Sequence, residues 1–321
     1  MPVDSPASIS PDSLPRIAAV GFLNALPLIE GLSQLSTLSL TLAAPSKIVG
    51  MLTRGEADLA LASIADVARS TIPLTLVPVG MIGSPGATMT VRIFSRVPMR
   101  EITMLHADTD SHTSVVLAQL LLRQMYTIMP TVAPLNAAAI KSNLLNNGST
   151  QPETKPETKP VAMLLIGDKV VTNPPSLAEY PHVLDLGEAW HAWTNLPFMY
   201  ACWMCRTESL SSPESNARIR LGADILDRQR RHNATRISWI ARTRATSAGW
   251  PVELAEEYLS RTLSYEIDAL ERHAALRFLN EAHAQGFLPA CTPAWFDTQQ
   301  SVAPTVAPKT TASFTTPTIS S

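Results

Sequence analysis

Several neutral polar side chains follow apolar segments of this sequence, where they could bind an anionic ligand. Asn24 ends the strand-like run IAAVGFL, and Ser63 ends the run DLALA. In the segment DTDSHTSV, Ser111, Thr113 and Ser114 stand just before a strong helical pattern, and the free N–H groups at a helix N-terminus favour carboxylates. The chemistry suggested is carboxylate binding by uncharged donors. A simple turn at Asn24 and ordinary helix caps at the serines are the alternatives.

Two cysteines form a C-x-x-C pattern, which elsewhere marks a redox pair or half of a zinc site. Cys202 and Cys205 lie in the continuous apolar run FMYACWMC, which is typical of a buried strand rather than an exposed helix start. No second pair completes a zinc site. With Cys291 the chain has three cysteines, an odd number that makes no disulfide framework. We therefore predict buried thiols and no metal.

The elements that position these side chains alternate between short strands and helices. Strands are predicted in IAAVGFL, SLTLAA, DLALA, LTLVPVG, TVRIFS, EITMLHAD, TVAPL and VAMLLIGD. One helix is predicted from a cap at Ser46 to about Gly55, and another over residues 111–126. From about Ser212 the pattern is almost wholly helical, with Gly286 as a C-terminal cap. This alternation indicates the α/β class with a mostly parallel sheet.

Length and charge restrict the class of protein further. A chain of 321 residues is too long for one ordinary core, so we expect two lobes, with the helical end returning to cover the first. The net charge is −2 and no basic run occurs, which argues against a nucleic-acid partner. The N-terminus lacks a secretory signal, and no apolar stretch reaches the roughly 18 residues of a membrane span. We expect a cytoplasmic protein with no membrane partner.

Three segments have compositions that do not favour packing. Residues 1–15 and 291–321 are rich in Ser, Thr, Pro and Ala, and we predict disordered tails there. The tandem repeat PETKPETKP lies within an expected insertion over residues 150–160. We interpret that insertion as a polar surface loop between two ordered elements, without assigning it a function.

Seven sequence blocks, in order, resemble the chorismate dehydratase family of the futalosine route to menaquinone. They are AVGFLNALPLIEGL, PSKIVGMLTRGEADLALAS, GATMTVRIFSRVP, SHTSVVLAQLLL, AMLLIGDKV, DLGEAWHAWTNLPFMYACWMCR and a terminal helix ending HAQGFLP. The resemblance spans roughly Arg16 to Pro289 and implies a two-lobed type II periplasmic-binding-protein-like fold with a helical C-terminal region. It implies lobe 1 over residues 16–94 plus 197–290, and lobe 2 over residues 95–196.

The resemblance also implies an activity, namely a carbon–oxygen lyase (hydro-lyase) that removes water from chorismate to give 3-[(1-carboxyvinyl)oxy]benzoate. Loss of water makes the ring aromatic, so neutral groups that orient the substrate suffice. No metal or organic cofactor is expected, since the elimination involves no redox change. The substrate's own enolpyruvyl carboxylate could act as the base, but the sequence does not assign one.

The predicted site comprises two catalytic and five substrate-binding positions. Asn24 matches the family's FLN motif, while Thr90 stands where the family often has Ser and keeps the hydroxyl. Substrate contacts are expected from Ser63, Ser111, His112, Thr113 and Ser114. His112 replaces an arginine of the family pattern, so a side chain turned toward solvent is the alternative there. Gly167 and Asp168, which follow a predicted strand, are interpreted as structural.

Two other functions are compatible with the sequence. One is 1,4-dihydroxy-6-naphthoate synthase, a later enzyme of the same route with the same fold, although the FLN and DLGEAWHAWTNLPF blocks favour the dehydratase. The other is a non-catalytic cytoplasmic carboxylate-binding protein, which would bind the ligand without turnover. The sequence does not indicate the oligomeric state.

Overall fold

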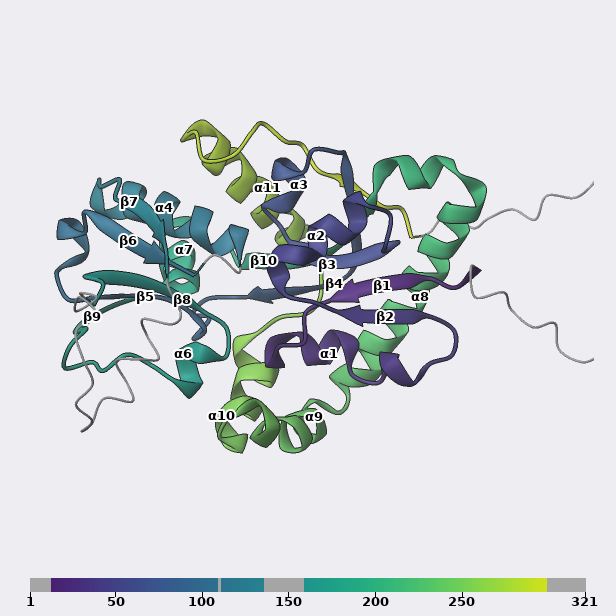
Figure 1. Ribbon diagram of the computed structural model, residues 1–321, viewed down its shortest axis with the longest axis horizontal. Coiled ribbons are helices and arrows are strands. Elements are labelled where there is room, and N and C mark those ends of the chain that lie inside the picture. The colour runs from purple at the N-terminus through teal and green to yellow at the C-terminus, as the bar shows by residue number, and fades with distance from the viewer. Residues whose placement is uncertain (1–12, 109–110, 136–158, 299–321) are drawn as a thin grey trace, which may run out of the picture.

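The computed structural model describes residues 13–108, 111–135 and 159–298, which form two lobes that each contain one β-sheet (Figure 1). Lobe 1 has a six-stranded sheet in the order β11-β4-β10-β3-β1-β2, and lobe 2 has a five-stranded sheet in the order β7-β6-β8-β5-β9. The strands of the two sheets are β1 (Arg16–Ala19), β2 (Ser39–Leu42), β3 (Leu59–Ser63), β4 (Leu74–Ser84), β5 (Val91–Ser95), β6 (Met104–Ala107), β7 (Thr131–Pro134), β8 (Ala162–Ile166), β9 (His182–Asp185), β10 (Phe198–Arg206) and β11 (Ala294–Trp295). The α/β class is confirmed.

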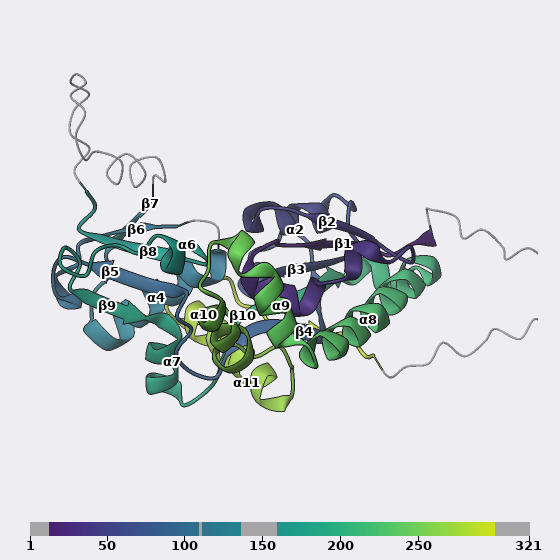
Figure 2. The same cartoon turned by 90° about the horizontal axis from the view of Figure 1, so that it is seen from below.

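Helices cover the sheets and join them. The α-helices are α1 (Leu26–Ile29), α2 (Pro45–Thr53), α3 (Asp66–Arg69), α4 (His112–Tyr126), α6 (Lys169–Thr172), α7 (Leu186–Thr194), α8 (Pro213–Ala234), α9 (Ile237–Arg244), α10 (Val252–Glu257) and α11 (Ala269–Ala284). Figure 2 shows α9, α10 and α11 where the two lobes meet. The predicted helical C-terminal region is therefore present, and it contacts both lobes rather than the first alone.

Parallel pairing forms the centre of lobe 1. β1 lies between β2 and β3 and is parallel to both, and its residues Ile17, Ala18 and Ala19 are fully buried. The helix α2 that follows β2 begins at Pro45, with Ala44 as its N-cap and no side-chain cap. The expected Ser46 cap is wrong, because Pro45 already occupies the first helical turn, a position that suits proline.

The chain crosses into lobe 2 earlier than expected. β5 pairs with β8 and β9 in the five-stranded sheet, so the segment up to residue 94 does not all belong to lobe 1. The chain instead passes from lobe 1 to lobe 2 between Ser84 at the end of β4 and Val91 at the start of β5, and we call residues 85–90 the crossing segment. The expected boundary at residue 94 places most of the run TVRIFS in lobe 1, whereas β5 belongs to lobe 2, because a hydrophobic pattern reports burial and not the partner strand. The return crossing lies between α7 and β10.

The helical pattern near the C-terminus contains an interruption. After α10 the chain makes one π-helical turn, η7 (Tyr258–Thr262), and then pairs with β4 through a bridge between Gly83 and Ser264. The helix α11 then begins after Asp268, which is its N-cap and forms a capping box with Glu271. Gly286 has a φ of +80°, the left-handed conformation expected of a glycine after a helix.

Parts of both expected tails are ordered. Ala294 and Trp295 form β11 parallel to β4, and Phe296 is buried and donates its N–H to the carbonyl of Leu76. Pro15 is also buried, and its carbonyl accepts a hydrogen bond from Ser39. A few aromatic residues therefore anchor a segment whose overall composition suggested a tail. Residues 1–12 and 299–321 of the expected tails, and most of the 150–160 insertion, lie outside the described residues.

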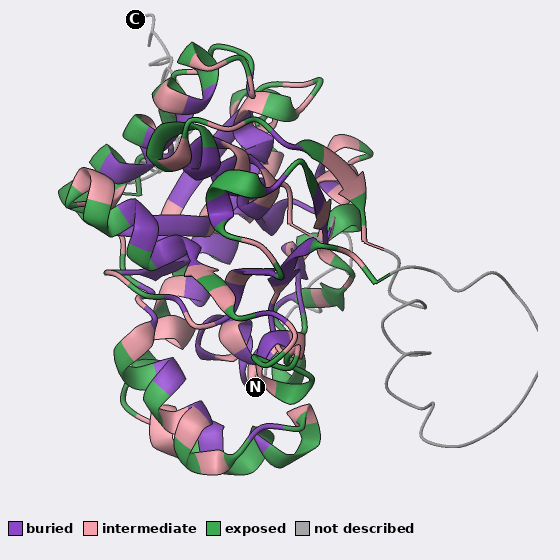
Figure 3. Cartoon of the chain, turned by 90° about the vertical axis from the view of Figure 1, so that its left-hand side faces the viewer, coloured by how far each residue is buried: buried purple, intermediate pink, exposed green. Residues whose placement is uncertain are grey.

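Burial follows the strands. Figure 3 shows the buried residues concentrated in the strands, with exposed residues on the outer helices. Cys202 and Cys205 are both buried in β10, as the apolar run predicted. Burial raises the pKa of each thiol to about 12, so both stay protonated at neutral pH. Within the described residues, no helix is long and apolar enough to cross a membrane.

An ion-pair cluster in lobe 1 makes stability depend on pH. Burial of Asp58 opposes its ionisation, but hydrogen bonds from Arg16 and the nearby charges of Arg16 and Arg218 outweigh that cost and lower its pKa. A carboxylate with a lowered folded-state pKa stabilises the protein above its unfolded pKa of about 3.9, and that stabilisation is lost as the pH falls through the folded-state value.

Asp58→Asn should therefore destabilise the protein at pH 7. Its difference from the unaltered protein should shrink below about pH 4, measured by urea unfolding. A difference independent of pH would contradict this assignment.

Candidate active site

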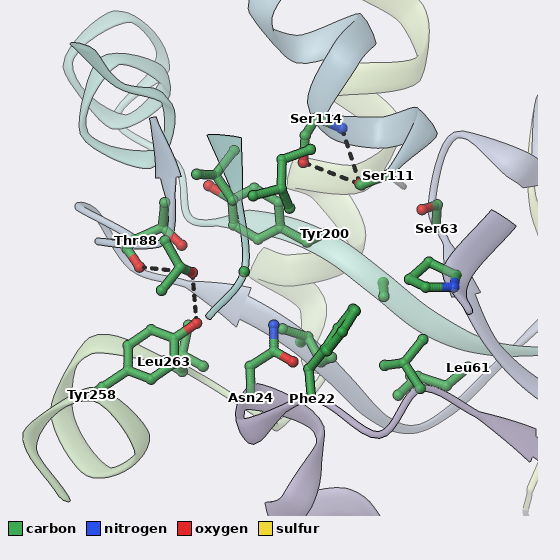
Figure 4. Close-up of a pocket in the computed structure, with 18 residues that line it drawn as sticks. Phe22, Asn24, Leu61, Ser63, Thr88, Ser111, Ser114, Tyr200, Tyr258 and Leu263 are labelled. Carbon is green, nitrogen blue, oxygen red and sulfur yellow. Dashed lines mark hydrogen bonds between the residues drawn. The ribbon is translucent and has the colours of Figure 1, made fainter. Parts of the chain in front are cut away.

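A pocket lies between the two lobes, and most of the predicted site residues line it (Figure 4). The space between its walls, counted together with the open mouth, is about 750 Å³. Its walls come from the β1–α1 connection, the ends of β3 and β8, the crossing segment before β5, the N-terminus of α4, the strand β10 and the π-turn η7. The pocket therefore depends on segments that are far apart in the sequence.

Asn24 lies on the lobe 1 wall, in the one-turn 3-10 helix η2 (Leu23–Ala25) that follows β1. Pro27 occupies the first turn of the next helix, α1, so the chain turns at this point and leaves Asn24 at the pocket. Its amide oxygen Oδ1 is buried and has no hydrogen-bond partner among the described residues. A buried acceptor without a partner costs free energy unless a ligand supplies the donor.

Thr90 lies in the crossing segment just before β5, and it is buried with 2 % of its surface exposed. Its hydroxyl oxygen lies 2.7 Å from the hydroxyl of Tyr258. It also donates a longer hydrogen bond, of 3.5 Å, to the carbonyl of Thr88. Thr90, Thr88 and Tyr258 all line the pocket, so three hydroxyl groups share one part of its wall.

The N-terminus of α4 faces the pocket through two serines. Ser111 is the N-cap, and its side chain accepts a hydrogen bond from the backbone N–H of Ser114 at 3.3 Å. The Ser114 hydroxyl donates to the Ser111 hydroxyl at 3.0 Å. Both residues line the pocket, as does Ser63 at the end of β3 (Figure 4). This wall therefore offers three hydroxyls beside the positive end of a 15-residue helix, a combination that suits a carboxylate.

His112 and Thr113 differ from expectation, because their side chains face lobe 1 rather than the pocket. The His112 ring nitrogen Nδ1 lies 2.6 Å from Oδ1 of Asp66, which is buried at the start of α3. Thr113 is fully buried, and its hydroxyl accepts a hydrogen bond from the backbone N–H of Ala65 at 3.1 Å. On a helix, neighbouring residues point in different directions, so 112 and 113 cannot share the face of 111 and 114. Their contacts instead join the two lobes.

The electrostatic character of the pocket is neutral. Within the described segments, no side chain on its wall belongs to Asp, Glu, Lys, Arg or His. The titratable groups there are the phenols of Tyr200 and Tyr258, and burial raises the pKa of each well above 10. Hydrogen bonds with Thr90 and Asn24 partly oppose this effect at Tyr258. Both phenols therefore stay protonated near neutral pH and do not act as bases.

Asp168 lies outside the pocket wall and supports the turn that carries Asn24. It follows β8 in lobe 2, and its carboxylate accepts hydrogen bonds from the backbone N–H of Leu23 at 3.5 Å and from Trp250 at 3.1 Å. Leu23 precedes Asn24 in η2, so this contact joins lobe 2 to the turn that carries Asn24. Burial raises the pKa of Asp168, and the two hydrogen bonds partly oppose that effect. The expected structural role for Asp168 agrees with these contacts.

Sequence reasoning missed three residues that shape the site. Tyr200 looked like one more apolar residue of a strand, and Tyr258 like one more residue of a helical pattern. Asp185, the N-cap of α7, bonds to the crossing segment that carries Thr90. Only the position of Asp185 directly before a helical pattern was visible locally, and it predicts a cap rather than a long-range contact.

Comparisons with known proteins agree with this architecture. The model of the family described as "Menaquinone biosynthesis" matches residues 15–284 of the chain. Chorismate dehydratase of Thermus thermophilus is 26% identical over 294 residues, which cover 87% of this chain and 97% of the relative.

Solved structures show the same fold at low sequence identity. A Candida albicans protein with the generic periplasmic binding protein fold superposes with a TM-score of 0.57 at 11% identity, covering 87% of this chain and 92% of the other. The alkanesulfonate-binding protein of Xanthomonas axonopodis superposes with a TM-score of 0.55 at 15% identity, covering 88% and 96%. The predicted periplasmic-binding-protein-like fold is therefore confirmed.

Proposed function

This chain belongs to the menaquinone biosynthesis family, and we propose that it is a hydro-lyase that dehydrates chorismate to 3-[(1-carboxyvinyl)oxy]benzoate. The family membership and the similarity to a chorismate dehydratase support this proposal. The observation that carries it is the neutral pocket between the lobes, lined by an amide and several hydroxyls. The reaction would form part of the futalosine route and would take place in the cytoplasm.

The chemistry of chorismate explains why a neutral pocket is sufficient. The C–H bond at the ether-bearing ring carbon breaks first, and its electron pair is delocalised toward the ring carboxylate. The neighbouring C–O bond then breaks, the hydroxyl leaves and takes up a proton as water, and the ring becomes aromatic. Because aromatisation supplies much of the driving force, the protein has to orient the substrate and stabilise the charge that develops.

The residues divide into a carboxylate-binding wall and a reacting face. Ser63, Ser111 and Ser114, with the N-terminus of α4, would bind one carboxylate of the substrate. Asn24 and Thr90 lie elsewhere on the wall and would contact the departing hydroxyl. The buried Oδ1 of Asn24, which lacks a partner among the described residues, can accept a hydrogen bond from that hydroxyl and orient it in the bound substrate. The negative charge of the leaving oxygen needs a donor, which the N–H₂ group of Asn24 or the hydroxyl of Thr90 would supply.

The proton acceptor in this scheme belongs to the substrate. The described wall carries no carboxylate or imidazole, and its two phenols stay protonated near neutral pH. We propose that the enolpyruvyl carboxylate of chorismate takes the proton from the adjacent ring carbon. The protein would then contribute orientation, which can supply a large share of a rate enhancement.

The proposed function is tested by incubating the purified protein with chorismate. The expected result is a product lighter by one water molecule in mass spectrometry, with loss of the diene absorbance and appearance of a benzoate spectrum. Binding without product above the spontaneous rate in buffer would overturn the proposed reaction and favour a carboxylate-binding protein.

The contact between His112 of lobe 2 and Asp66 of lobe 1 leads to a separate prediction. The His112–Asp66 contact joins α4 of lobe 2 to α3 of lobe 1, so we expect it to favour the arrangement of the lobes that forms the pocket and to stabilise the bound substrate and the transition state equally. His112→Ala should therefore raise KM for chorismate about 10-fold and leave kcat nearly unchanged, as expected for one hydrogen bond to a charged group. Steady-state kinetics measure both values.

The partner residue supplies the control for this prediction. Asp66→Ala should raise KM to a similar extent, and the double variant should be no worse than either single variant, because both remove the same contact. Additive effects in the double variant, or a fall in kcat with KM unchanged, would show that His112 acts on the substrate itself.

A further inference from the structure

We propose that Tyr258 is a positioning residue that fixes the Thr90 hydroxyl in its reactive orientation. The inference rests on the proposed function and adds a residue from the helical C-terminal region to its site. Tyr258 is 168 positions away from Thr90 in the sequence, yet their hydroxyl oxygens are 2.7 Å apart. Figure 4 shows Tyr258 near Asn24, at the part of the pocket where we place the departing hydroxyl.

The hydrogen bonds of Thr90 leave Tyr258 as its main partner. The Thr90 hydroxyl has one proton, and its other contact, to the carbonyl of Thr88, is 3.5 Å long and therefore weak. If Thr90 donates to Thr88, it accepts the proton of Tyr258, and in the opposite arrangement it donates to Tyr258. In both arrangements the short bond to Tyr258 decides where the remaining lone pair or proton of Thr90 points. Without the phenol, only the weak contact would orient this hydroxyl.

Tyr258 is itself held firmly. Only 1 % of its surface is exposed, and its ring stacks on Trp250 with centroids 4.9 Å apart and planes 19° from parallel. The Trp250 ring N–H donates to Asp168, which follows β8 in lobe 2. Tyr258 also begins the π-turn η7, and single π-turns often occur at functional sites. The phenol is therefore held in place by contacts with both lobes.

The charge state of Tyr258 defines what it can do. Burial raises the pKa of its phenol well above 10, so it is a neutral hydrogen-bond partner and not a proton acceptor in the reaction. The Asn24 amide interacts with the same phenol. Tyr258 therefore connects the two residues of the reacting face, and its loss should affect the oriented transition state more than ground-state binding.

The experiment removes the hydroxyls of Tyr258 and Thr90, singly and together, and compares the resulting losses in kcat. Tyr258→Phe should lower kcat for chorismate about 10-fold with KM changed by less than about 3-fold, as expected when one hydrogen bond is lost. Thr90→Val should lower kcat by about 100-fold. If Tyr258 acts through Thr90, the double variant should be no slower than Thr90→Val alone, whereas independent roles would multiply to about 1,000-fold.

Tyr265 provides a matched control. It is also a buried tyrosine near the same turn, but its hydroxyl has no hydrogen-bond partner among the described residues and it is not on the pocket wall. Tyr265→Phe should therefore leave kcat unchanged. Thermal unfolding of all four variants separates loss of folded protein from loss of rate, because a purely structural role for Tyr258 would lower Tm and leave kcat per folded molecule intact.

Each outcome decides between the alternatives. Full kcat in Tyr258→Phe, or multiplicative effects in the double variant, would overturn the positioning role while leaving the proposed function in place. Absence of product with the unaltered protein would overturn the proposed function and this inference with it. A 10-fold loss that disappears in the Thr90→Val background supports the inference.

Discussion

Asn24→Ala is expected to lower kcat for chorismate by about 10²–10³, the usual loss when one preorganised polar group at a reacting centre is removed. The Asn24 side chain lines the pocket and its buried Oδ1 makes no hydrogen bond within the described residues, so the fold does not use this acceptor. The substrate would use it, and the loss should be in kcat more than in KM. Steady-state assays of product formation measure both parameters.

A second asparagine separates this effect from a general loss of stability. Asn216 in α8 is also half-buried with an Oδ1 that lacks a partner in the described structure, but it lies outside the pocket. Its amide N–H₂ donates to the carbonyl of Leu210, so Asn216→Ala should cost some stability without lowering kcat. Retention of full activity in Asn24→Ala would show that the reacting face lies elsewhere on the pocket wall.

The pocket-lining residues that could be predicted from the sequence stand at the ends of regular elements. Asn24 follows β1, Ser63 ends β3 and Ser111 caps α4, and each position was visible from a change in the hydrophobic pattern. Strand ends of one sheet and helix N-termini meet at predictable edges, so local reading of the chain reaches this part of the site.

The residues that could not be predicted depend on contacts between distant segments. Tyr258 reaches Thr90 only because a π-turn and the stacking on Trp250 aim its ring at the pocket, and no local pattern encodes either. His112 and Thr113 are adjacent to serines that line the pocket, yet the helix turns them toward lobe 1. The same limit applies to the fold, since β5 was visible as a strand while its sheet was not.

Asp185→Ala is expected to lower both the stability of the protein and its activity. This buried carboxylate ends β9 and accepts hydrogen bonds from the N–H groups of Gly187 and Glu188 at the start of α7. It also accepts from the backbone N–H groups of Thr88 at 2.9 Å and Met89 at 2.8 Å. One side chain therefore fastens the crossing segment to lobe 2.

The backbone of that segment needs such support. Met89 has a φ of +65°, a left-handed conformation that costs free energy in a residue with a side chain, and Thr90 follows it directly. Without the carboxylate, several N–H groups and the Arg92 guanidinium lose their partner, which should reduce the free energy of unfolding by about 3–5 kcal/mol. Met89 would then relax and displace Thr90, so kcat per folded molecule should fall as well. Urea unfolding and steady-state kinetics measure the two effects.

Asp58 is the matched control, because it is a similarly buried carboxylate that bonds to arginines in lobe 1, and it does not line the pocket. Asp58→Ala should also destabilise the protein while kcat per folded molecule stays close to that of the unaltered protein. Met89→Gly removes the strain without removing the carboxylate, and it should be tolerated or slightly stabilising. If Asp185→Ala and Asp58→Ala behave alike in kcat, Asp185 is an ordinary structural carboxylate and the crossing segment positions Thr90 by other contacts.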